Sequence, residues 1–187
     1  MCTNHVTSTN PVLTLPASPA DEQPPRSWKS KAPARLPPAL IVAATLSSIA
    51  ALVALVVIGD GLHQVVLIPP LAASMALVAG APGLPLAQPR NVIGGQLVSA
   101  SVGLLVTAVA GTSMWWAAVA GGLALGAMLV LRTSHSPAAA TAVIAAHAAP
   151  GPLLFLSLLT LATVVLVCIG IIGARAAGNR QYPVYWW

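Results

Sequence analysis

The side chains capable of chemistry are few, and four of them surround one proline. Ser134, His135 and Ser136 stand directly before Pro137, and Thr141 follows one helical turn later. Ser136 is a suitable N-cap and Pro137 suits the first helical position, so the sequence predicts a helix that begins here. The first amides of a helix have no intrahelical partner and carry partial positive charge, so this helix start could hold a small anion. His135 could add a donor or, when protonated, a positive charge, and Ser134 and Thr141 could add hydroxyls. The structural alternative is that Ser136 only caps the helix and His135 packs against a carbonyl.

A second proline segment resembles the first. The small apolar run after Pro70 aligns with the run after Pro137, and Ser74 then takes the place of Thr141. This start has no polar N-cap, so we expect its free donors to be met by another segment, by water or by a ligand. The alignment predicts an internal repeat, with chance similarity between alanine-rich runs as the alternative.

Three more polar residues follow the second segment. Arg90 could anchor the topology or attract an anion at the cytoplasmic mouth. Asn91 could cap a helix that begins at Val92. Gln96 lies one turn further along, where we expect it to face protein or a cavity and not lipid.

The composition places these residues in a membrane. Of 187 residues, 57% are hydrophobic and 6% are charged, against roughly 25% charged in globular proteins. The net charge of +5 forms no concentrated basic patch, so we expect no nucleic-acid partner. The two cysteines, Cys2 and Cys168, do not make a disulfide scaffold. Without a carboxylate inside the apolar spans or a phosphate-binding motif, the sequence predicts no enzyme, no cofactor and no metal.

The apolar region predicts an all-α, polytopic membrane helix bundle. A spanning helix needs about 20 apolar residues, and four stretches provide a full span: 39–58, 92–111, 114–131 and 152–174. Two further segments, 64–80 and 133–149, are broken by prolines and predict short helices. Residues 1–38 are rich in proline, serine and threonine and carry half of the basic residues, so they predict a disordered tail before a transmembrane domain at 39–187.

Charge distribution favours six passes through the lipid bilayer. If both short segments cross, every basic loop residue lies on the side of the tail, whereas re-entrant segments would leave Arg90 and Arg132 outside. Both termini would then be cytoplasmic. Each half, about 39–111 and 114–174, crosses three times, which predicts a 3+3 inverted repeat of the kind found in transporters. Glycines spaced four apart, such as Gly122 and Gly126, would pack helices within one chain or in a homo-oligomer.

Three runs in the sequence resemble the HPP family of integral membrane proteins. They are Gln88–Gly95, His135–Ala142 and Tyr182–Trp186, and the resemblance covers about residues 40–187. Family members in plastids and cyanobacteria are associated with nitrite transport, which the resemblance implies here. The family is usually described with four spans. Ser136 replaces the middle residue of the family's His-Pro-Pro motif, and Gln96 stands where the family usually has histidine.

Our leading hypothesis is a transporter or facilitator of a small inorganic anion, with nitrite implied by the resemblance. The anion would be held where the helix from Pro137 meets the helix from Pro70. One alternative is a non-transporting assembly or regulatory protein, marked by a tightly filled region without a polar cavity. Another is a metal-binding membrane protein that uses His63, His135 and His147. We expect the bacterial plasma membrane as its location, with the plastid envelope as the alternative.

Overall fold

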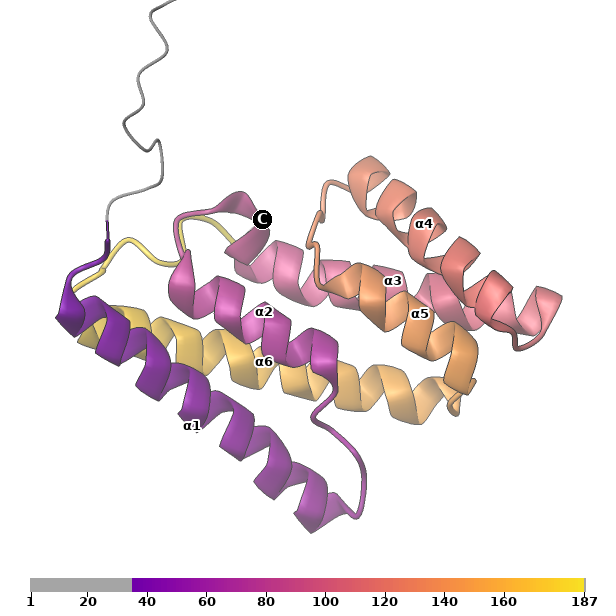
Figure 1. The fold of residues 1–187 in the computed structure, drawn as a ribbon, viewed down its shortest axis with the longest axis horizontal. Helices are drawn as coiled ribbons and strands as arrows, with labels where there is room; N and C mark the ends of the chain where they lie inside the picture. Colours follow the sequence, from indigo (N-terminus) through magenta and orange to yellow (C-terminus); the bar gives the residue numbers. More distant parts are fainter. Residues whose placement is uncertain (1–34, 187) are drawn as a thin grey trace, which may run out of the picture. The chain divides into compact units, whose positions relative to one another are not determined.

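The computed structural model describes residues 35–186, and all the regular secondary structure of this part is helical (Figure 1). Most of the predicted tail lies outside the described residues. The helices are α1 Pro38–Leu62, α2 Pro69–Gly80, α3 Pro89–Ala110, α4 Met114–Val130, α5 Ala138–Ala148 and α6 Pro152–Ala176, with a short 3-10 turn, η2, at Pro85–Ala87.

Three of the described helices, α1, α3 and α6, are long and apolar enough to cross a membrane. The helices α2, α4 and α5 are apolar but shorter. At 17 residues, α4 is about 26 Å long, somewhat less than the hydrocarbon core of about 30 Å. The all-helical prediction is therefore confirmed with three long candidate spans, and the fourth predicted span is shorter than expected.

Prolines set the helix starts, as the sequence predicts. α2 begins at Pro69, and α5 begins one residue after Pro137. The residues before each start, 65–68 and 133–135, are not helical. Proline lacks the amide hydrogen and clashes with the preceding turn, so neither helix extends backward through its proline. Both segments consequently combine a non-helical entry with a short helix.

Consecutive helices run in opposite directions along the bundle (Figure 1). α1 packs on α2 and α6, and α2 also packs on α6. α4 packs on α5 and α3, and α5 also packs on α3. α3 contacts α6, and α2 contacts α5. Helix α3 thus packs on α4, α5 and α6.

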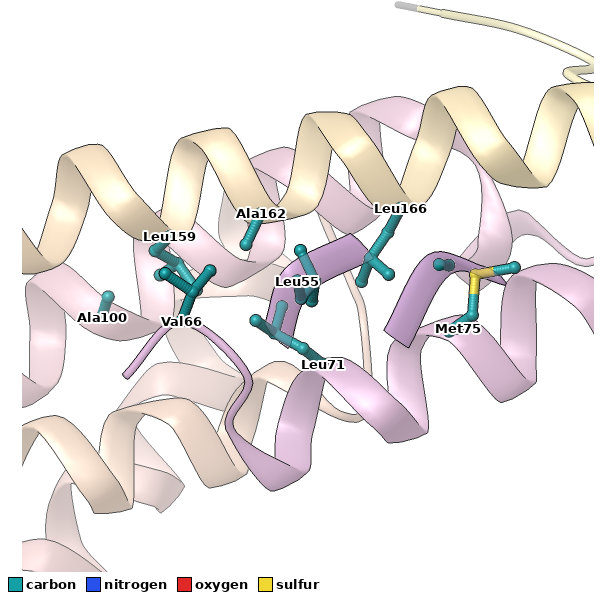
Figure 2. Packing of buried hydrophobic residues seen from close by; sticks show 9 residues of the cluster. Leu55, Val66, Leu71, Met75, Ala100, Leu159, Ala162 and Leu166 are labelled. Atoms are coloured by element: carbon teal, nitrogen blue, oxygen red, sulfur yellow. The ribbon is translucent and has the colours of Figure 1, made fainter. Parts of the chain in front are cut away.

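Aliphatic side chains fill the space between α1, α2 and α6. Leu55 of α1, Leu71 of α2 and Leu166 of α6 are fully buried in one cluster, shown in Figure 2. The contact of α3 with α5 depends instead on a missing side chain. Any Cβ atom on Gly103 would collide with the backbone of Ala142. Burial of small and branched apolar residues therefore holds the short helices against the long ones.

Apolar side chains also cover the outside of the bundle. Val109, Val130 and Leu153 are each more than 80% exposed. Exposed apolar surface on this scale is costly in water and suits contact with lipid. Gly122 and Gly126, expected to pack helices, have open space where a Cβ atom would lie. Their packing role within the chain is therefore wrong, and a role between chains stays a prediction.

Candidate functional site

Four polar side chains meet inside the apolar bundle. Ser74 comes from α2, Gln96 from α3, His135 from the segment before α5, and Thr141 from α5. All four are fully buried. We call these four residues the polar cluster. All four belong to the residues that the sequence predicts to hold a ligand.

Hydrogen bonds connect the polar cluster into a chain. Thr141 Oγ1 donates to Gln96 Oε1 at 2.5 Å, and Gln96 Nε2 donates to Ser74 Oγ at 3.0 Å. Ser74 Oγ lies 2.7 Å from His135 Nε2. The side-chain amide of Gln96 therefore links the two hydroxyls that the sequence aligns, one from each short helix.

The ring of His135 is held from its other side. Its Nδ1 atom lies 2.8 Å from the carbonyl oxygen of Leu86 in η2. A carbonyl only accepts hydrogen bonds, so Nδ1 must carry the hydrogen. In the neutral ring, Nε2 is then an acceptor and receives the hydroxyl hydrogen of Ser74. This arrangement fixes both the orientation and the tautomer of the imidazole.

Gln88 fixes the turn that presents the Leu86 carbonyl. Its Nε2 atom donates to the carbonyls of Pro82 at 2.9 Å and Leu84 at 3.0 Å. Its Oε1 atom accepts from the backbone amide of Val184 at 2.8 Å. The fully buried amide of Gln88 thus joins the turn to the C-terminal segment of the chain.

Tyr182 and Asn91 hold the same turn from two more directions. The hydroxyl of Tyr182 donates to the carbonyl of Ala87 at 2.9 Å, and its side chain is only 2% exposed. Asn91 Nδ2 donates to the carbonyl of Pro85 at 2.9 Å. The expectation that Asn91 caps α3 is therefore wrong, because that helix begins two residues earlier, at Pro89. Sequence reasoning missed the roles of Gln88 and Tyr182, although both lie in the runs that resemble the family.

The start of α5 differs from the prediction. Ser136 is exposed and makes no capping bond with its side chain, and Pro137 takes the N-cap position. The amides of Ala138 and Ala139 donate to the carbonyls of His135 and Ser136 in a tight turn. Because His135 is drawn toward Ser74 and Leu86, the chain turns before the helix and uses its first donors locally.

The start of α2 has no free donors either. Pro69 and Pro70 lack amide hydrogens, and the amide of Leu71 donates to the carbonyl of Ile68 at 2.9 Å. The expectation of unpaired helix amides aimed at a shared gap is therefore wrong for both helices. The polar groups that meet between the helices belong to side chains.

Two further predicted residues lie outside the polar cluster. Arg90 is half-buried at the start of α3, and its Nη2 atom donates to the carbonyl of Leu131 at 3.3 Å. It lies six residues before Gln96, about 9 Å along the helix axis. Ser134 is half-buried beside His135. Because Gln96 is nearer to the start of α3 than to its end, Arg90 lies at the end of the bundle that is nearer to the polar cluster.

The other two histidines of residues 35–186 lie apart from the buried one. His63 follows α1 and His147 lies near the end of α5, and both are exposed. Within residues 35–186, no three histidine, cysteine or carboxylate side chains gather closely enough to hold a metal ion. The geometry therefore gives the metal-binding alternative no support.

A separate cavity lies between α1, α2 and α6. Its volume is about 240 Å³, and its lining is mostly apolar, with Ser47 and Asn179 as polar exceptions. The polar cluster does not contribute to this lining. The cavity brings together the start of α1, the end of α2 and the end of α6, so these three helix ends lie on one side of the bundle.

Comparison with known proteins identifies the family. Residues 33–183 match the family model described as HPP, transmembrane region. The chain belongs to the HPP family. This HPP protein is similar to two transmembrane proteins of Dictyostelium discoideum. One is 35% identical over 124 residues, covering 62% of this chain and 40% of the relative, and the other is 35% identical over 131 residues, covering 65% and 46%. The chain thus spans less than half the length of these curated relatives.

No solved structure matches this HPP protein. Its family and its apolar helices make it an integral membrane protein. The polar cluster consequently lies in a protein whose outer surface faces lipid.

Proposed function

We propose that this HPP protein is a transporter or facilitator of a small inorganic anion, nitrite in the first place, and not an enzyme. The polar cluster is the observation that carries the proposal. Buried polar side chains in a membrane protein are costly and tend to lie on substrate or ion pathways. Here both proline-broken segments and α3 contribute to one such group of side chains.

The donors for the anion come from side chains. Ser74 and Thr141 carry hydroxyls, Gln96 an amide and His135 a ring N–H. An anion that leaves water needs such donors in place. In the present structure the hydroxyls and the amide bond within the polar cluster, and the ring N–H bonds to the Leu86 carbonyl, so binding exchanges these internal bonds for bonds to the anion. Arg90, at the nearer end of the bundle, attracts the anion toward this site.

The pairing of helices supports an inverted repeat. Exchanging α1, α2 and α3 for α4, α5 and α6 turns each packed helix pair into another packed pair. The separation of 67 positions between Pro70 and Pro137 extends to this packing. Gly103 lies against Ala145 of α5, and Gly170 lies against Val78 of α2, at the same separation. Such repeats allow a central site to open alternately to either side.

Six passes fit the positions of the basic residues. Arg90 contacts the carbonyl of Leu131, next to Arg132, and the end of α6 with Arg175 shares a cavity with the end of α2. These arginines therefore lie at one end of the bundle, which the positive-inside rule assigns to the cytoplasm. We place the C-terminus on that side, in a bacterial plasma membrane or, as the alternative, a plastid envelope.

Uptake of labelled nitrite into liposomes that contain the purified protein tests the proposal. Thr141→Val removes a hydroxyl that donates to Gln96, and Thr160→Val removes a hydroxyl of α6 that bonds only within its own helix. We expect Thr141→Val to slow uptake at least tenfold, about 1.4 kcal/mol, and Thr160→Val to leave it nearly unchanged. Equal uptake by both variants would remove the polar cluster from the pathway.

The filled polar cluster also favours a second candidate, a non-transporting assembly or regulatory protein. All four side chains are fully buried and bonded to each other. Such a network is sufficient to fix the arrangement of the helices without any ligand. In that case the protein would give no uptake above empty liposomes, and Thr141→Val would lower stability alone.

A further inference from the structure

Ser74 has two acceptors for a single hydrogen. Its Oγ atom lies 2.7 Å from His135 Nε2 and 2.8 Å from the carbonyl oxygen of Pro70. A serine hydroxyl donates only once. At any moment the hydroxyl of Ser74 therefore points either to the imidazole or to its own helix.

The two hydroxyl orientations match the two protonation states of His135. In the neutral ring, Nδ1–H donates to Leu86, and Nε2 accepts the hydrogen of Ser74. When Nε2 gains a proton, it donates to Ser74 Oγ, and the hydroxyl turns to Pro70. Gln96 Nε2 donates to Ser74 Oγ in both states. Every polar atom around the ring thus keeps a partner without movement of any heavy atom.

We propose that Nε2 of His135 is a proton-binding site whose occupation is coupled to transport of the anion. This inference rests on the proposed function. The step is a simple proton transfer: an N–H bond forms at Nε2 while an O–H bond of hydronium from the aqueous phase breaks, and release reverses both changes. The positive imidazolium then offsets the charge of an anion bound next to it, so that anion and proton cross together.

The charged and titratable groups around His135 are accounted for. Those on the elements packed against it, and on the segment clamping η2, are Arg90, Arg132, His147, Tyr182 and Tyr185, whose hydroxyl lies 3.4 Å from the Pro85 carbonyl. α2 and η2 carry none. Arg90 donates to the Leu131 carbonyl, Arg132 and His147 are exposed, and Tyr182 donates to the Ala87 carbonyl. A negative partner for the imidazolium is therefore expected from the anion itself.

Initial rates of labelled nitrite uptake, with and without an inward proton gradient, test the coupling. The rate in protein-free liposomes is subtracted, because nitrous acid also diffuses through lipid. We expect the gradient to accelerate wild-type uptake several-fold. His135→Asn keeps a donor for the Leu86 carbonyl but removes Nε2, so we expect it to exchange nitrite more slowly at equal pH and to lose the acceleration by the gradient. The exposed His147→Asn is the matched control and should respond like the wild type.

Wild-type uptake that ignores the gradient, or a His135→Asn protein that still responds to it, would overturn the coupling and leave the proposed function standing. No uptake at all would reject the proposed function together with the coupling. ¹⁵N NMR of histidine-labelled full-length protein gives a reading that does not depend on transport or on a variant's folding. It should show His135 with hydrogen on Nδ1 and none on Nε2 at neutral pH. The opposite tautomer would overturn the inference.

Discussion

The side chains of Ser74 and His135, 61 positions apart in the sequence, meet at 2.7 Å between Oγ and Nε2. This contact joins helix α2 to the segment that leads into α5. Each of the two proline-broken segments is therefore bound to the other through a polar bond, and α3 supplies the amide of Gln96 beside it. The contact therefore joins the two halves of the chain at the polar cluster.

Removal of the central amide should destabilise the protein. In Gln96→Leu, the hydroxyls of Ser74 and Thr141 lose a partner in a fully buried place. We expect a loss of about 1–3 kcal/mol in unfolding free energy, measured by denaturant titration in detergent. Gln64→Leu, at an exposed position between α1 and α2, is the control. Equal stabilities for the two variants would contradict the bonding described for Gln96.

The clamp on η2 should depend on one hydroxyl. Tyr182→Phe leaves the Ala87 carbonyl without its side-chain donor, which we expect to cost about 1–2 kcal/mol. Tyr185, whose exposed hydroxyl lies 3.4 Å from the Pro85 carbonyl, provides the matched change Tyr185→Phe with little expected effect. Thermal unfolding of both variants in detergent distinguishes them, and a Tyr182→Phe protein as stable as wild type would refute the clamp.

The two equivalent glycines should be equally intolerant. A Cβ atom at Gly103 meets the backbone of Ala142, and one at Gly170 meets the side chain of Val78. We expect Gly103→Ala and Gly170→Ala each to lower stability by about 1–3 kcal/mol through overpacking. Gly126→Ala, in open space within the chain, should be neutral or slightly stabilising. If only one of the two tight positions were sensitive, the repeat would lose this support.

Topology can be read from two labelled positions on either side of α2. In a cysteine-free background, single cysteines at the exposed positions Gln64 and Leu84 are labelled with an impermeant reagent in intact cells. Six passes predict opposite accessibility, with Leu84→Cys protected until the cells are opened. A re-entrant α2 would expose both positions on the same side of the membrane.

The sequence predicts the helices better than it predicts their ends. Proline chemistry alone locates the starts of α2 and α5, because a missing amide hydrogen is a local property. The capping roles expected for Ser136 and Asn91 are wrong, because both depend on contacts made elsewhere in the chain. His135 bonds to Leu86 and Asn91 to Pro85, and these bonds set the backbone at each site.

The polar cluster itself was largely predictable. Ser74, Gln96, His135 and Thr141 stand out because polar residues are rare in this chain, and the alignment pairs Ser74 with Thr141. The bonding of both Ser74 and Thr141 to Gln96 could not be predicted, since it depends on how three helices pack. Tyr182, which supports η2, is 95 positions from its partner Ala87. No local sequence pattern spans that separation.

Transport with two substitutions at Gln96 tests the central claim most directly. Gln96→His keeps a donor in the polar cluster, whereas Gln96→Leu removes it, and both are compared as folded, reconstituted protein in labelled nitrite uptake. The account predicts uptake by the wild type, substantial uptake by Gln96→His, and a fall to the level of empty liposomes for Gln96→Leu. Uptake by Gln96→Leu at the wild-type rate, or none by the wild type, would contradict it.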